Sequence, residues 1–193
     1  IAAEAAAIMA FAALKNNDRA GMLSFTDKVE KIIKPKKGKN NILRIISEIL
    51  DFNPSGSKTS ISTALKALNE IWRRRAVVFL ISDFRDGNYS KDLSIAAKKH
   101  DLICVKIEDD RETEIPNAGL IEFRDAETGE FFLADCCSAA DIFRKKSETF
   151  EDNTKKIFQK AKVDVINLNA GRSYVKPLIR FFKERERKKQ SGI

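Results

Sequence analysis

The sequence is poor in the residues that build disulfide frameworks, zinc sites and membrane spans. It holds three cysteines and a single histidine among 193 residues, and two of the cysteines, Cys136 and Cys137, are adjacent. These residues supply neither a disulfide framework nor the ligand spacing of a zinc site. No apolar run approaches the ~20 residues that a membrane helix needs. We therefore expect a cytoplasmic protein with reduced thiols and no membrane span.

The body of the chain also lacks the cationic excess of a nucleic-acid-binding domain. The formal net charge is +8, but eight cations lie between Arg172 and Lys189 against two glutamates. The rest of the chain is close to neutral, so nucleic acid is not the ligand that we expect.

The basic tail divides into an apolar beginning and a charged end. Pro177 suits the first turn of a helix, and the apolar residues beside it should dock on the body: Leu178, Ile179, Phe181 and Phe182. We expect the charged run from Lys183 to Lys189 to project into solvent without a role in folding. The alternative is that this basic end grips nucleic acid, with an affinity that falls steeply with salt.

The middle of the sequence contains a segment that is predicted to form a buried strand. Residues Ala76 to Ile81 are six consecutive apolar residues without polar alternation, a pattern typical of a parallel strand covered on both faces. Asp83 follows at the carboxyl end of this strand, where open α/β sheets bind their ligands. A cap on the turn closed by Asp86 and Gly87 is an equally good interpretation of Asp83.

Helical and strand patterns alternate along the chain, which predicts an α/β sheet covered on both faces. We expect helices at 1–15, 41–50, 60–72, 90–100 and 139–161, with a final helix in the tail. Strands are expected at 20–25, 29–33, 76–81, 102–107 and 163–168, and a second hairpin at 120–134. The predicted architecture is a three-layer Rossmann-like sandwich with a mostly parallel central sheet and an antiparallel pair at one edge. No strand precedes the first helix, so we expect one upstream of Ile1.

Few motifs of known chemistry are present. The run Gly56-Ser57-Lys58-Thr59 superficially resembles a phosphate-binding loop, but Phe52 and Ser57 stand where that motif requires glycine. The run also follows a helix, not a strand. The carboxylates Asp109 and Asp110 follow a strand end, although a solvated acidic loop is the commoner role of such a cluster. The remaining candidates are Thr59, just before a helix, and Asp83. Their hard oxygen ligands suit Mg²⁺ or Ca²⁺, yet two ligands are too few to hold a metal well.

Three stretches carry a family resemblance: NNDRAGMLSF from Asn16, GSKTSISTAL from Gly56, and RRRAVVFLISDF from Arg73. Together with the segments that follow, they resemble the DUF58 family of von Willebrand factor A-like domains. The resemblance implies a metal-ion-dependent adhesion site, in which Thr59 matches the threonine and Asp83 the aspartate. The D-x-S-x-S loop of such a site would lie upstream of Ile1. The family often has aspartate after the threonine, and this chain has Ser60 there.

The resemblance implies one von Willebrand A-like domain over residues 1–193, lacking its first strand and ending in a basic helix. We expect an interaction domain and not an enzyme, in which Mg²⁺, or Ca²⁺ or Mn²⁺ in its place, leaves a coordination position open to an acidic side chain of a protein partner. Family members are commonly encoded beside MoxR-type AAA+ ATPases, which suggests such a partner. The alternative is a metal-dependent phosphoester hydrolase that uses Asp83 with Asp109 or Asp110.

Overall fold

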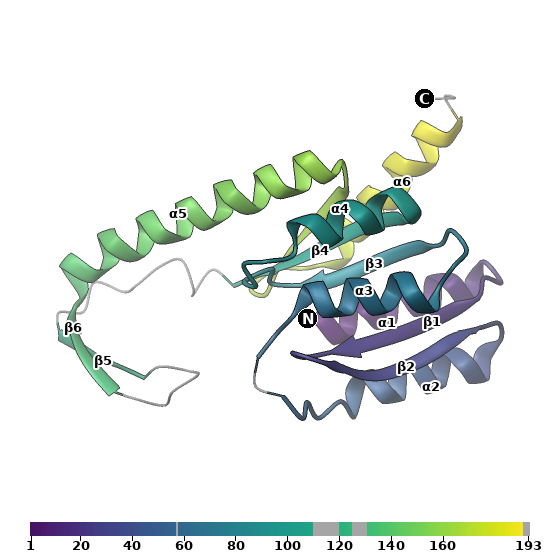
Figure 1. Ribbon diagram of the computed structural model, residues 1–193, viewed down its shortest axis with the longest axis horizontal. Coiled ribbons are helices and arrows are strands. Elements are labelled where there is room, and N and C mark those ends of the chain that lie inside the picture. Colours follow the sequence, from purple (N-terminus) through teal and green to yellow (C-terminus); the bar gives the residue numbers. More distant parts are fainter. Residues whose placement is uncertain (57, 110–119, 125–130, 191–193) are drawn as a thin grey trace.

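A computed structural model describes residues 1–56, 58–109, 120–124 and 131–190 (Figure 1). Its centre is a parallel sheet of three strands in the order β3 (Val77–Ser82), β4 (Asp101–Glu108) and β7 (Asp164–Asn169). Val77 is in register with Asp101, and Ile103 with Asp164. The predicted apolar strand is therefore an edge strand of this sheet, with β4 in the middle. Its carboxyl ends, and hence Asp83, lie on one side of the molecule.

The antiparallel pair forms its own sheet. Strands β1 (Ala20–Phe25) and β2 (Val29–Lys36) pair with one another, as predicted, but β1 has no hydrogen-bonded partner in the parallel sheet. The prediction of one central sheet that carries this pair at its edge is therefore wrong for the described part of the chain. Helix α1 (Ala2–Lys15) packs against both β1 and β3 and so joins the two sheets through side chains and not through a ladder.

Helices cover both faces of the parallel sheet, because its strands are apolar on both sides. One face packs against α3 (Ile61–Ile71), α4 (Ser90–Lys99) and the last turns of α5 (Cys136–Ala161), with Leu65, Leu93, Cys104 and Phe158 buried between them. The other face packs against α1 and α6 (Val175–Gln190). A third apolar cluster joins α1 and α2 (Lys39–Leu50) to β1 and β2. The α/β class with helices on both faces is thus as predicted.

The long helix α5 leads away from this body. It follows the predicted hairpin of β5 (Leu120–Arg124) and β6 (Phe131–Asp135), and Figure 1 shows the hairpin at the far end of the helix. The predicted acidic site residue Asp110 lies outside the described residues. None of the helices among the described residues is both long enough and apolar enough to cross a bilayer.

The tail helix α6 contacts the sheet beyond its apolar beginning, as far as Arg185. Leu178 is buried, and the Phe182 ring lies 6.0 Å from that of Phe79, as the apolar beginning predicts. Farther along, the Arg185 guanidinium binds Asp101 at 2.6 Å and Asp164 at 3.4 Å. These carboxylates stand at the starts of β4 and β7. The expectation that the whole run from Lys183 onward projects into solvent is therefore wrong at Arg185.

Candidate functional site

Asp83 directly follows β3 and is exposed at the carboxyl edge of the parallel sheet. Its Oδ1 accepts hydrogen bonds from the Arg85 backbone N–H at 3.2 Å and from the Ser82 hydroxyl at 3.3 Å. Within the described residues no ion pair involves Asp83. The carboxylate therefore orders its own turn, as the alternative interpretation holds, and still presents oxygen to solvent. The two interpretations are compatible.

Phe84 fixes the direction in which Asp83 points. Its φ of 61° lies in the left-handed region, which is unfavourable for a bulky side chain. The ring is completely buried, 4.9 Å from the Phe158 ring and 5.7 Å from the Tyr89 ring. Packing of the ring compensates for the backbone conformation. With Phe84 turned inward, the preceding carboxylate stays on the surface.

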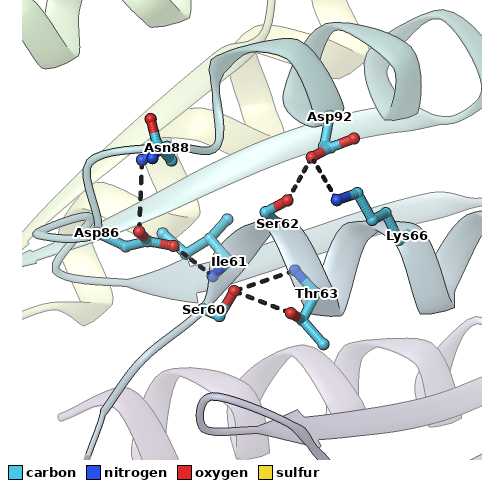
Figure 2. A network of polar contacts seen from close by, with 8 residues as sticks. All are labelled: Ser60, Ile61, Ser62, Thr63, Lys66, Asp86, Asn88 and Asp92. Carbon is cyan, nitrogen blue, oxygen red and sulfur yellow. Dashed lines mark hydrogen bonds and ion pairs between the residues drawn. The ribbon is translucent and has the colours of Figure 1, made fainter.

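Asp86 ties the same loop to the beginning of α3 (Figure 2). Its Oδ2 accepts the Ile61 backbone N–H at 2.7 Å, and its Oδ1 accepts that of Asn88 at 3.4 Å. A carboxylate at a helix N-terminus satisfies a free backbone donor and interacts favourably with the helix dipole. The loop after β3 and the start of α3 are therefore one connected unit.

A second carboxylate joins α3 to α4 in the same region. Asp92, in the first turn of α4, accepts a hydrogen bond from the Ser62 hydroxyl and lies 3.7 Å from the Lys66 ammonium (Figure 2). Sequence reasoning missed both Asp86 and Asp92 as α3 contacts, because the partners Ile61 and Ser62 lie 25 and 30 residues away. Contacts between residues so far apart in the sequence cannot be recognised from the spacing of neighbouring residues.

Thr59 is exposed and stands immediately before the N-cap of α3. The cap is Ser60, whose hydroxyl accepts the Thr63 backbone N–H at 3.3 Å and lies 2.9 Å from the Thr63 hydroxyl. The Ser60 side chain is thus engaged within α3. The Asp86–Ile61 bond brings the segments of Thr59 and Asp83 to the same edge, but no hydrogen bond joins the two predicted ligands.

The chain on both sides of Thr59 is hydrogen-bonded to the turn between β1 and β2 and to the start of β2. The Ser60 backbone N–H donates to the Thr26 carbonyl at 2.8 Å, and the Ser55 hydroxyl donates to the Glu30 carboxylate at 2.7 Å. Hydrogen bonds from Ser55 and Thr26 lower the pKa of Glu30 below its usual range. A side chain at Gly56 would overlap Thr26 and Asp27, so this segment lies directly on the turn.

A buried cation lies beside Asp83. The side chain of Lys106, near the end of β4, is 5% exposed and pairs with Glu151 of α5 and, at 3.1 Å, with Glu108. The Lys106 ammonium and the Arg85 guanidinium each lie 5.7 Å from the centroid of the Phe150 ring. These side chains, Asp83 and Asp109 line one small hollow. The edge therefore combines an exposed carboxylate with a neutralised buried lysine.

The ligands for a metal are few. No group of three or more histidine, cysteine, aspartate or glutamate side chains could hold a metal ion in the part of the chain that the structure describes. Thr59 and Asp83 offer one hydroxyl and one carboxylate, both hard oxygen ligands of the kind that Mg²⁺ and Ca²⁺ take. The donor chemistry fits such an ion, but it covers only part of a coordination sphere.

Comparison with solved structures shows the same fold in two Bacteroides proteins. The chain superposes on the conserved hypothetical protein BatB of Bacteroides thetaiotaomicron with a TM-score of 0.56 and 15% identity, over 97% of this chain and 88% of that one. An aerotolerance-related membrane protein of Bacteroides fragilis gives a TM-score of 0.55 and 14% identity, over 87% and 81% of the two chains. At these identities the likeness concerns the fold alone.

Sequence relatives point to one family. An uncharacterized protein of Mycobacterium avium is 28% identical over 143 residues, which are 72% of this chain and 83% of that protein. An uncharacterized protein of Mycobacterium tuberculosis is 25% identical, and the match spans 72% of this chain but only 44% of that protein. The model of the family described as protein of unknown function DUF58 matches residues 1–156. The chain therefore belongs to the DUF58 family.

Proposed function

We propose that this chain is a von Willebrand A-like adaptor domain that binds an acidic protein partner through a divalent cation at the Asp83 edge. The observation that carries the proposal is the state of Asp83: an exposed carboxylate, without an ion pair in the described residues, held outward by the buried Phe84 ring. A carboxylate fixed in this way can accept a cation without first breaking an internal salt bridge.

Thr59 and Asp83 would hold the ion. Both segments are fixed, one by the Thr26–Ser60 hydrogen bond and the other by the Asp86–Ile61 hydrogen bond. Mg²⁺ bound there supplies positive charge and vacant positions for oxygen ligands, and Ca²⁺ or Mn²⁺ could take its place. A glutamate or aspartate of the partner would complete the coordination, and the D-x-S-x-S loop that the family resemblance implies would add further ligands.

The partner that the resemblance suggests is a MoxR-type AAA+ ATPase. The chain itself contributes an adaptor surface and no catalytic step in this proposal. The carboxyl edge suits such a role. The loop after β3, the start of α3 and the turn between β1 and β2 are joined there by hydrogen bonds, and Asp83 stays exposed.

Binding to a purified MoxR-type ATPase from the same organism tests the proposal. We expect binding in Mg²⁺, its loss in EDTA, and a loss of at least tenfold in Asp83→Asn, which keeps the shape of the side chain but removes its charge. The control is Asp18→Asn, another exposed carboxylate, which lies just before β1. Binding that is unaffected by EDTA and by Asp83→Asn would contradict the proposal.

The hydrolase alternative has one supporting observation, because Asp109 lines the same hollow as Asp83. A metal-dependent phosphoesterase would release nitrophenol from p-nitrophenyl phosphate in Mg²⁺ or Mn²⁺ and would lose this activity in Asp83→Asn and Asp109→Asn alike. The adaptor proposal predicts no turnover above that of the double variant.

A further inference from the structure

The amino edge of the parallel sheet, opposite Asp83, is strongly cationic. Strands β3, β4 and β7 run parallel in register, so the turns that precede them lie in one row. These turns carry five exposed cations, the amino-edge cations: Arg73, Arg74, Arg75, Lys98 and Lys162. Adjacent strands are separated by about 4.8 Å. The three turns thus lie within roughly one Debye length at physiological salt, and their charges act together.

The amino-edge cations are not neutralised by the rest of the described chain. None of the five takes part in an ion pair among the described residues. The carboxylates that belong to this edge, Asp101 and Asp164, already bind Arg185 of α6. Glu70, in the last turn of α3, is the nearest exposed acid along the chain. A surplus of positive charge therefore faces solvent.

Helix dipoles explain only part of this pattern. Lys98 lies in the last turn of α4, where a cation is favoured by the dipole and needs no ligand to explain it. The three arginines follow Trp72, the C-cap of α3, and lie outside any helix. They stand in a solvated turn of four residues between α3 and β3. Three arginines without an ion pair among the described residues are more than capping of α3 requires.

Apolar side chains accompany the cations. Ile71 is 38% exposed at the end of α3, and Trp72 beside it is half-buried. Ile71 and Trp72 directly precede the arginine triplet, and cations beside tryptophan and aliphatic side chains are typical of surfaces that rest on the headgroup region of a bilayer. Nucleic acid would be bound through phosphates and stacked bases, and an exposed isoleucine beside the arginines adds nothing to that contact.

We infer that the amino edge of the sheet docks on an anionic phospholipid surface, with Arg73, Arg74 and Arg75 as its main contacts. A flat layer of headgroups meets all three turns at once, whereas each turn alone is too small a site. The opposite edge, with Asp83, Asp86 and Asp109, would then face away from the anionic surface. This inference does not rest on the metal or on the ATPase partner.

Cosedimentation with vesicles tests the docking surface. The probes are vesicles of phosphatidylcholine mixed with phosphatidylserine and vesicles of phosphatidylcholine alone, each at low and high salt. We expect binding to the anionic vesicles only, weakened at high salt. Each cation near an anionic surface contributes about a factor of five. The variant R73Q/R74Q/R75Q should therefore lose roughly a hundredfold in partitioning.

The matched control is K28Q/K58Q/K91Q, which removes the same charge from three exposed lysines near the carboxyl edge: Lys28 between β1 and β2, Lys58 before α3 and Lys91 in the first turn of α4. It should bind as the unmodified chain does. The inference is overturned if the unmodified chain ignores phosphatidylserine, if it binds phosphatidylcholine equally well, or if the two triple variants lose equally. It is also overturned if duplex or single-stranded DNA competes the chain off the vesicles at equal phosphate concentration.

Discussion

At the scale of single residues, Phe84 controls the geometry next to Asp83. Its ring fills the space between Phe158 and Tyr89, so Phe84→Ala should destabilise the fold by about 3–5 kcal/mol through lost burial and a cavity. Urea unfolding measures this. Phe11→Ala is the control, since Phe11 is 52% exposed on α1 and should change stability by no more than about 0.5 kcal/mol. Equal effects of the two substitutions would contradict the account of Phe84.

His100 should make stability depend on pH. It is 1% exposed, and neither ring nitrogen has a hydrogen-bond partner in the described part of the chain. Burial, and secondarily the charge of Lys99, lowers the pKa of His100 in the folded protein. Below the ordinary histidine pKa of about 6.5, the unfolded chain binds a proton that the folded chain does not.

The stability contributed by neutral His100 is therefore fully present above that value and is lost as the pH falls through it toward the lowered pKa of the folded state. Melting temperatures recorded between pH 7.5 and pH 5 should decline more steeply for the unmodified chain than for His100→Gln. Parallel curves would show that His100 does not cause the decline.

At the scale of elements, Arg185 links the second half of α6 to the parallel sheet. Its guanidinium is 22% exposed and binds the carboxylates of two different strands. Removal of one partner from such a partly buried network costs about 1–3 kcal/mol. Arg185→Ala should therefore lower stability by that amount, and so should truncation after Lys183.

Arg180→Ala is the matched control on the same helix. Arg180 is 81% exposed and, among the described residues, pairs only with Glu184 one turn away, an interaction that is worth at most about 0.5 kcal/mol. If Arg180→Ala were as harmful as Arg185→Ala in thermal unfolding, general helix propensity and not the strand contacts would explain the loss.

The same elements show what the sequence could and could not predict. Apolar periodicity placed strands 20–25 and 77–82 and helices α1, α3 and α4 within a few residues, because each pattern is local. The Arg185–Asp101 pair joins residues 84 positions apart, and Asp86 reaches Ile61 across 25. Such contacts depend on how the elements assemble, which no local spacing encodes. The left-handed conformation of Phe84 was equally unpredictable, since it depends on the rings that receive its side chain.

In the candidate site, too, the sequence predicted local positions but not contacts between distant residues. The pattern placed Asp83 at the end of a parallel strand and Thr59 at the start of a helix, and the structure has both there. Either Thr59 or Ser60 could cap that helix by the sequence pattern, and the structure has Ser60 as the N-cap. The pattern did not show that a buried Lys106 would pair with α5 beside Asp83. The metal ligands themselves stay a prediction.

At the scale of the whole molecule, the two main sheets each have an open edge. Neither β1 nor β3 has a second hydrogen-bonded neighbour among the described residues, and α1 packs on both strands. The family resemblance implies a strand upstream of Ile1. Such a strand between β1 and β3 would form hydrogen bonds with the unpaired backbone groups of both. In hydrogen exchange, the unpaired amides of β1 and β3 should be protected in an upstream-extended form and exchange faster in residues 1–193. Equal protection in both forms would contradict the expected strand.

We propose that Asp83 and Thr59 hold a divalent cation at the carboxyl edge, and titration with paramagnetic Mn²⁺ can detect such an ion. Titration of the ¹⁵N-labelled chain with Mn²⁺ should broaden the amide signals of residues 59–61 and 83–86 first. The binding should be weak because two ligands leave most of the sphere to water. Excess Mg²⁺ should restore the signals, and Asp83→Asn should abolish the broadening. No selective broadening at these residues, or broadening that persists unchanged in Asp83→Asn, would contradict the claim.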